Sequence, residues 1–349
     1  MAYTNIDLPT DYFNTVLWTG NNSSPRNITT GHATDLVWVK FRSSAFNHRL
    51  FDNVRGGSKK LISNNTDAED TGATNDVTAF ISTGFTIGAN INNSADGTVV
   101  GWSWKANGTG SSNTSGTITS TVSANTTSGF SIVSYTGNGA TAASIGHGLN
   151  VTPAMMIVKK RSATHEWCIW HKSLSSATQS YLQFDTLAAQ TSVNVWGNTA
   201  PTSSLFYVGP ASVTNGSSAT FIAYCFAEIK GYSRFGSYTG NGSADGTFVY
   251  TGFKPAFVIV KRYNDAGYDW LMYDNKRQVE FNVVDDFLKP NLSDAETTGN
   301  ANQSLDFLSN GIKFRGSGAS SNGSGSTYIY MAFAENPFVS STGIPTTAR

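Results

Sequence analysis

The sequence predicts an all-β fold of three tandem β-sandwich repeats. Three observations lead to this: a strand pattern that occurs three times, turn motifs that recur with it, and almost no helical periodicity. A repeat of about 100 residues has the size of a two-layer sandwich. We expect a jelly-roll or lectin-like arrangement, with an immunoglobulin-like sandwich as the alternative, and a helix content below about 10 %.

The repeated strand lies at 97–105, 218–228 and 326–335. Each copy carries large apolar residues at alternate positions, which is the period of a β-strand. These residues are Val100, Trp102 and Trp104; Ile222, Tyr224 and Phe226; and Ile329, Met331 and Phe333. The other face of each copy is mostly Gly, Ser, Ala or Cys, so a second layer can lie close to the backbone. We therefore predict a core strand in each repeat, with Trp104, Phe226 and Phe333 buried.

Other elements recur in the same order. An aromatic residue followed by Thr-Gly-Asn stands at 18–21, 135–138 and 238–241, and Gly-Asn is turn chemistry. Unbroken apolar runs that end in lysine follow, and such runs are typical of strands covered on both faces. Because the first and last strands of each repeat are both strongly hydrophobic, we expect them to lie near each other.

These repeats divide the chain into five parts. The predicted parts are a first sandwich with an N-terminal arm (1–107), a flexible linker (108–128), a second sandwich (129–230), a third sandwich (231–338) and an extended C-terminal tail (339–349). The linker assignment rests on its Gly, Ser, Thr and Asn content. The alternation of Ile118 and Val122 leaves open that part of it adds as an edge strand.

Composition excludes several classes of protein. Twenty-three basic residues balance 23 acidic ones, so the chain lacks the basic excess of a nucleic-acid-binding protein. The first residues have neither a basic region nor an apolar core, so we expect no signal peptide. No apolar run approaches the ~20 residues needed to span a bilayer. The two cysteines, Cys168 and Cys225, are expected to be buried free thiols.

Two pairs of acidic segments are the strongest candidates for a site. Asp52-Asn53-Val54-Arg55 matches Asp274-Asn275-Lys276-Arg277, and Thr66-Asp67-Ala68-Glu69 matches Ser293-Asp294-Ala295-Glu296. Paired carboxylates can catalyse glycoside hydrolysis or bind Ca²⁺. We favour a structural interpretation instead, in which each Asp ties down a local turn or pairs with the nearby Arg. The second repeat has His171-Lys172 at the first place and no match at the second.

Two further sets of residues have a functional and a structural interpretation. One lysine ends the second strand of each repeat: Lys40, Lys159 and Lys261. These lysines could together form a ligand-binding surface, but we expect exposed ammonium groups, in water or paired with Glu228 and Glu335. Trp167, Trp196 and Trp270 could stack on sugar rings, but packing in the core is the commoner role of such residues. The sequence thus assigns no catalytic, cofactor-binding or metal-binding residue and no cofactor.

The chain resembles a family of repeated domains in virion proteins of marine bacteriophages, often described as tail-fibre-like. The resemblance covers nearly the whole chain and rests on 9–17, 129–137, Gly146-His147-Gly148-Leu149 with Pro153, and the Phe-Ala-Glu ends at Glu228 and Glu335. It implies a non-enzymatic structural protein of the virion, assembled in the bacterial cytoplasm.

From this we expect a tail fibre or appendage that contacts the host. The alternatives are a capsid-decorating protein and, less favoured, a polysaccharide-degrading tail enzyme. The expected partners are other virion proteins, further copies of this chain and a host surface glycan or protein, without nucleic acid and without a membrane span.

Overall fold

The computed structural model describes residues 3–92, 97–278 and 282–346. Strands make up 43 % of the protein and helices 4 %, which confirms the all-β prediction. The sheets are antiparallel, and the paired strands fall into three segments of chain, called here unit one (13–104), unit two (111–227) and unit three (233–337). Cys168 and Cys225 are free and buried, as expected.

Unit one packs a five-stranded sheet against a three-stranded sheet. The larger sheet has the order β1-β8-β3-β4-β5, and the smaller has the order β2-β7-β6. The strands are β1 (Phe13–Thr19), β2 (Arg26–Thr29), β3 (Leu36–Phe41), β4 (Arg49–Asp52), β5 (Leu61–Ile62), β6 (Val77–Ile81), β7 (Gly84–Ile87) and β8 (Thr98–Trp104). A 3₁₀ turn, η1 (Pro9–Asp11), precedes β1, and a short helix, α1 (Ala89–Asn92), follows β7.

Unit two has the order β14-β13-β18-β11-β10-β9 in its main sheet, with two small sheets, β12-β17 and β15-β16. Its strands are β9 (Ser111–Asn113), β10 (Ser120–Asn125), β11 (Phe130–Thr136), β12 (Ala143–Gly146), β13 (Pro153–Lys160), β14 (Trp167–His171), β15 (Ser180–Tyr181), β16 (Thr191–Ser192), β17 (Leu205–Val208) and β18 (Thr220–Ala227). One short helix, α2 (Ser212–Asn215), precedes β18.

Unit three has the order β19-β25-β21-β22 in its main sheet and β20-β24-β23 in the other. Its strands are β19 (Ser233–Thr239), β20 (Phe248–Tyr250), β21 (Phe253–Arg262), β22 (Trp270–Asp274), β23 (Leu305–Leu308), β24 (Gly311–Phe314) and β25 (Thr327–Pro337), with η2 (Ala301–Gln303) before β23. In every unit the first long strand pairs with the last: β1 with β8, β11 with β18, and β19 with β25. This pairing confirms the expected proximity of first and last strands.

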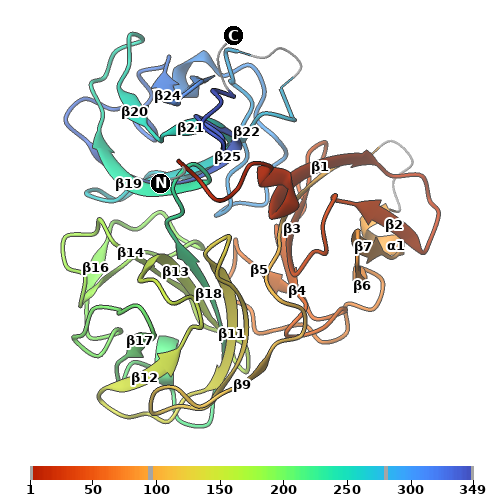
Figure 1. Cartoon of the computed structure of the whole chain (residues 1–349), viewed down its shortest axis with the longest axis vertical. Coiled ribbons are helices and arrows are strands. Elements are labelled where there is room, and N and C mark those ends of the chain that lie inside the picture. The colour runs from red at the N-terminus through yellow and green to blue at the C-terminus, as the bar shows by residue number, and fades with distance from the viewer. Residues whose placement is uncertain (1–2, 93–96, 279–281, 347–349) are drawn as a thin grey trace.

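The three units stand around a common centre, and Figure 1 shows them as three lobes with their main sheets facing inward. The bulky faces of the three repeated strands meet there in one hydrophobic cluster. Trp104, Phe226 and Phe333 occupy equivalent places, are at most 2 % exposed and form a triangle with ring centroids 5.8–6.1 Å apart. Their predicted burial is confirmed, and the three units share one core.

The small face of each repeated strand turns the other way, toward the second layer of its own unit. In unit two, for example, Ala223 and Cys225 pack in a separate cluster with Phe206 and Val208 of β17. Small side chains allow the second layer to approach the backbone, as the alternation in the sequence predicts.

The segment 108–128 is not a flexible linker. β10 pairs with β11 along its whole length, and β9 pairs with β10, so the segment extends the main sheet of unit two. The buried carboxylate of Asp35 fixes the start of this segment by accepting hydrogen bonds from the backbone N–H groups of Ala106 (2.8 Å) and Gly108 (3.1 Å). Its edge strand, β9, is largely exposed, whereas β10 beside it is buried or partly buried.

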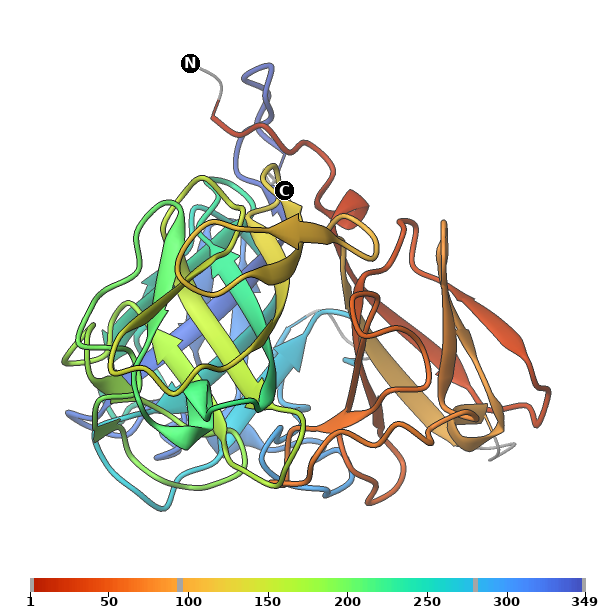
Figure 2. The ribbon, with the colours of Figure 1, turned by 90° about the horizontal axis from the view of Figure 1, so that it is seen from below.

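The C-terminal tail also differs from the extended arm that was predicted. Val339 bridges to Pro345, and the backbone N–H of Ser340 donates to the Ile344 carbonyl at 2.8 Å, so the chain turns back on itself. Residues 347–349 of the predicted tail lie outside the described residues. The tail contacts the N-terminal arm through the backbone N–H of Ser341, which donates to Oδ1 of Asp7 at 2.6 Å, and Figure 2 shows both termini on the same side of the molecule.

Candidate functional site

The carboxylate of Asp52 is held in a closed set of hydrogen bonds. It ends β4, is fully buried, and accepts from the backbone N–H of Arg55 at 2.8 Å and from Nε of the same residue at 2.5 Å. The hydroxyl of Tyr224, from β18 of unit two, donates to its Oδ2 at 2.8 Å. The local turn and the ion pair are therefore the ones predicted, but the bond from another unit was not predicted.

Asp274 repeats this arrangement at the end of β22. It accepts from the backbone N–H and Nε of Arg277 at 3.0 and 2.6 Å, and from Nε1 of Trp102 in unit one at 2.9 Å. Trp102 and Tyr224 hold the same position in the repeated strand. A buried carboxylate needs such donors, because an unpaired charge in the core is costly.

In unit two the acid is absent, and so is the donor from the neighbouring unit. The third member of this set in the repeated strand is Met331, whose side chain cannot donate a hydrogen bond. His171 takes the place of the aspartate, and its Nε2 lies 3.1 Å from the Tyr330 carbonyl of unit three. Burial lowers the pKa of His171 to about 3, so the ring is neutral.

The second pair of acids, Glu69 and Glu296, bridges units. Glu69 bonds Arg55 of its own unit at 2.9 Å and Arg161 of unit two at 2.9 Å. Glu296 bonds Arg277 of its own unit at 2.5 Å and Arg42 of unit one at 2.7 Å. Burial opposes ionisation of Glu69, yet the two guanidinium groups hold its pKa below the ordinary value.

The backbone shows a third member of this set that the sequence did not reveal. The N–H of Glu69 donates to the Arg161 carbonyl, that of Glu296 to the Arg42 carbonyl, and that of Gln190 to the Tyr263 carbonyl, at 2.8–3.0 Å. Tyr263 stands two residues after Lys261, as Arg42 and Arg161 stand two residues after Lys40 and Lys159. Gln190 was missed because neither it nor its partner is charged.

These contacts form a ring of interfaces. Unit one binds unit two through Glu69, unit two binds unit three through Gln190, and unit three binds unit one through Glu296. The acids that resembled a catalytic or calcium site are thus bonded to arginines inside these interfaces. Among the described residues, no group of three or more His, Cys, Asp or Glu side chains could hold a metal ion.

The expectation for the three lysines was wrong. Lys40, Lys159 and Lys261 are fully buried, and Glu228 and Glu335 pair with other cations. Each ammonium donates to backbone carbonyls, for example Lys261 to Tyr268 at 2.8 Å. Burial lowers the pKa of all three lysines to about 8. Lys159 also reaches another unit, because its ammonium donates to the Thr66 carbonyl of unit one at 3.2 Å. These bonds satisfy buried carbonyl groups that would otherwise lack a donor.

The three tryptophans that were weighed as sugar platforms are in the core. Trp167, Trp196 and Trp270 are at most 1 % exposed. Trp167 and Trp270 donate to carbonyls of the neighbouring unit, Ile62 at 2.7 Å and Gln183 at 2.8 Å, and so reinforce the ring. Core packing, the favoured interpretation, is confirmed for these residues.

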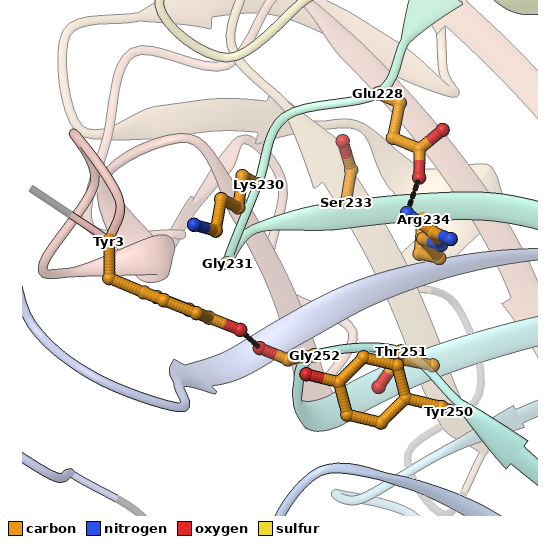
Figure 3. A pocket seen from close by; sticks show the side chains of 9 residues that line it. All are labelled: Tyr3, Glu228, Lys230, Gly231, Ser233, Arg234, Tyr250, Thr251 and Gly252. Carbon is orange, nitrogen blue, oxygen red and sulfur yellow. Dashed lines mark hydrogen bonds and ion pairs between the residues drawn. The ribbon is translucent and has the colours of Figure 1, made fainter. Parts of the chain in front are cut away.

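An accessible pocket lies elsewhere, where the N-terminal arm crosses the junction of units two and three. It has a volume of about 610 Å³ and is lined by Tyr3, Glu228, Lys230, Gly231, Ser233, Arg234, Tyr250, Thr251 and Gly252 (Figure 3). A smaller pocket of about 310 Å³ lies beside Asp35 and β6. None of the residues that line the larger pocket was predicted as a ligand-binding residue, because they are distant in sequence and follow no motif.

The pocket residues have distinct local roles. Arg234 forms an ion pair with Glu228, which also pairs with Lys172 of unit two. The hydroxyl of Tyr3 donates to the Gly252 carbonyl at 2.6 Å, and the Lys230 ammonium lies 4.4 Å from the centre of the Tyr3 ring. Burial, together with the neighbouring Tyr250, raises the pKa of Tyr3 to about 12, so the phenol is neutral at physiological pH.

Comparison with known proteins identifies a family for nearly the whole chain. The family described as "Domain of unknown function (DUF7483)" matches residues 8–337. The chain belongs to this family. No curated protein and no solved structure matches it. The described helices are all too short or too polar to cross a membrane.

Proposed function

We propose that this member of the DUF7483 family is a non-enzymatic structural protein of a bacteriophage virion, namely a tail fibre or appendage that contacts the host. The sequence resemblance to tail-fibre-like repeated domains supports this role. So does one structural observation: the side chains of the repeated acids are buried and bonded to arginines of their own unit, and Glu69 and Glu296 also bond arginines of a neighbouring unit, instead of lining an open cleft. A rigid body with exposed loops suits weak contacts made by many copies on a particle.

Locating the chain on the particle tests this proposal. Immunogold labelling or cryo-electron microscopy of the virion should place it at the tail tip or tail hub. Purified protein should also compete with virions for adsorption to host cells. Density confined to the capsid faces would contradict the tail assignment and support the alternative, a capsid-decorating protein.

The third candidate, a polysaccharide-degrading enzyme, has less support. A glycosidase needs two carboxyl groups about 5–10 Å apart in an accessible cleft, whereas Asp52 and Asp274 are buried. Incubation of purified protein with host surface polysaccharide should leave its chain length unchanged. Depolymerisation that is lost on Asp274→Asn in a folded variant would overturn this conclusion.

We also propose that the protein assembles with other virion proteins or with further copies of itself through its outer surface. The bulky faces of the three main sheets are already covered within one chain. Self-association by packing of these faces would require the ring to open.

A further inference from the structure

We propose that the pocket between the N-terminal arm and the junction of units two and three binds an acidic saccharide unit. This inference rests on the proposed contact with the host surface and names the chemistry of the ligand. The pocket volume of about 610 Å³ is within the usual range of sites for small ligands, about 300–1,000 Å³. Three separate parts of the chain build it, so its shape depends on the assembled ring.

The charge of the pocket favours an anion. Glu228 is the one acid among the described lining residues, and Arg234 and Lys172 both pair with it. Lys230 points to the same opening and contacts the Tyr3 ring, and it takes part in none of the ion pairs among the described residues. Two cations, Lys230 and Arg234, and one carboxylate therefore line the pocket, and Lys172, which lies outside the lining, also pairs with that carboxylate. The lining is thus net positive and can accept a carboxylate or sulfate group.

The repeat pattern is broken at this pocket. Arg234 pairs with Ala332 in β25, and the equivalent positions in the other units are Asn14 and Ser131. Lys172 occupies the position that Asn53 and Asn275 hold in the other units. Its backbone N–H donates to the Ala154 carbonyl, as those of Asn53 and Asn275 donate to the carbonyls of Asp35 and Ala256. Two neutral positions of the repeat thus carry cations only here. The ring contacts do not require these charges, because the other units do without them.

Two tyrosines supply the surface for a sugar ring. Tyr250 is 53 % exposed at the end of β20, and Figure 3 shows Tyr3 beside it, with both hydroxyls close to Gly252. Aromatic rings pack on the apolar faces of sugars, and a tyrosine adds a polar hydroxyl at the edge of its ring. The hydroxyl of Tyr3 already donates to the Gly252 carbonyl, so Tyr250 is the one of the two that offers its hydroxyl to a ring substituent. The neutral phenol of Tyr3 does not repel an anion. Cations beside aromatic faces match a sugar that carries a carboxylate better than they match a small inorganic anion.

Binding of defined oligosaccharides to the purified full chain tests the proposal. In isothermal titration calorimetry at low salt, trigalacturonate should bind at least about tenfold more tightly than maltotriose, which has similar rings without charge. Inorganic sulfate should bind more weakly than trigalacturonate because it offers nothing to the tyrosines. Equal affinities for trigalacturonate and maltotriose, or no binding of trigalacturonate, would overturn the assignment.

Variants with matched controls locate the site. Lys230→Gln and Tyr250→Ala should each weaken trigalacturonate binding about tenfold or more. Lys276→Gln, at an exposed lysine outside the pocket, and Phe248→Ala, at an exposed aromatic two residues from Tyr250, should change it less than about twofold. Binding that survives both pocket variants would refute the site, with circular dichroism showing that each variant is folded.

The outcome is separable from the proposed function. A failure to bind trigalacturonate would refute the pocket proposal but would not affect the tail assignment, since labelling of the particle does not depend on a saccharide. Conversely, capsid-only labelling with intact trigalacturonate binding would contradict the tail assignment and leave the site in place.

Discussion

Nε1 of Trp102 donates a 2.9 Å hydrogen bond to Oδ2 of Asp274, and both side chains are buried where units one and three meet. The hydroxyl of Tyr224 makes the equivalent bond to Asp52, between units two and one, at 2.8 Å. The aromatic side chains of the repeated strand therefore pack in the shared core, while their polar atoms, Nε1 of Trp102 and the hydroxyl of Tyr224, bond across the interfaces between units. The aspartates are part of how the ring is closed.

Removing the hydroxyl of Tyr224 should destabilise the protein without altering its fold. Tyr224→Phe leaves the carboxylate of Asp52 with one donor fewer in a buried site, and hydrogen bonds to charged groups contribute about 1.5–3 kcal/mol. Urea denaturation at pH 7 should show a loss of this size. The control, Tyr207→Phe at a partly exposed tyrosine of β17, should cost less than about 0.5 kcal/mol. Equal effects of the two variants would contradict the role of the inter-unit bond.

Breaking the bridge at Glu296 should cost more. Burial alone would lower the pKa of Arg277, but the carboxylates of Asp274 and Glu296 outweigh burial, and the pKa is raised. Glu296→Gln removes one of the two carboxylates that compensate the buried charge of Arg277. The expected loss is about 3–5 kcal/mol, as for other broken buried ion pairs. Thermal unfolding followed by circular dichroism measures it.

The matched control for this variant is Asp265→Asn. Asp265 pairs with Arg262 on the surface, where its side chain is 56 % exposed, and such pairs contribute about 0–1 kcal/mol. Similar losses in Glu296→Gln and Asp265→Asn would show that the interface bridge has no special weight.

Acid should destabilise the protein through its buried histidines. Burial lowers the pKa of His32 to about 4 and of His171 to about 3, from 6.5. As pH falls below 6.5, the unfolded chain binds protons that the folded chain does not, so stability is lost. At pH 5 each such histidine accounts for about 2 kcal/mol.

The variant His171→Gln tests this assignment. Burial raises the pKa of Asp35 and Asp185, which acts in the opposite direction, so the comparison of variant and parent is the informative one. The free energy of unfolding should fall by about 2 kcal/mol less in the variant than in the parent between pH 7 and pH 5. Identical pH profiles would exclude His171 as a source of the acid sensitivity.

The junction between units one and two should resist proteolysis in the native protein. Thermolysin under native conditions should leave 108–128 intact, because β9 and β10 are bonded into a sheet. Asp35→Ala removes the acceptor of two backbone N–H groups and should permit cleavage near 106–110. Rapid cleavage of the parent protein within this segment would restore the flexible-linker interpretation.

The sequence by itself determined the elements of this protein. Alternation of large and small residues predicted the repeated strands and the burial of Trp104, Phe226 and Phe333, since a period of two assigns each side chain to one face. The Asp-Asn-x-Arg spacing predicted the local pairs Asp52–Arg55 and Asp274–Arg277, because the partners are three residues apart. Local signals of this kind depend only on neighbouring residues.

Only the tertiary structure decided which faces and charges meet. The strand period says that one face is apolar but not what covers it, so the shared core of the three units could not be inferred. The same limit explains the errors at Lys40, Lys159 and Lys261, most of whose carbonyl partners lie outside their own strands. It also explains the error at 108–128, where two paired strands have the composition of a linker. The pocket at Tyr3 and Arg234 likewise exists only after distant segments pack together, because no local sequence pattern encodes a distance between units.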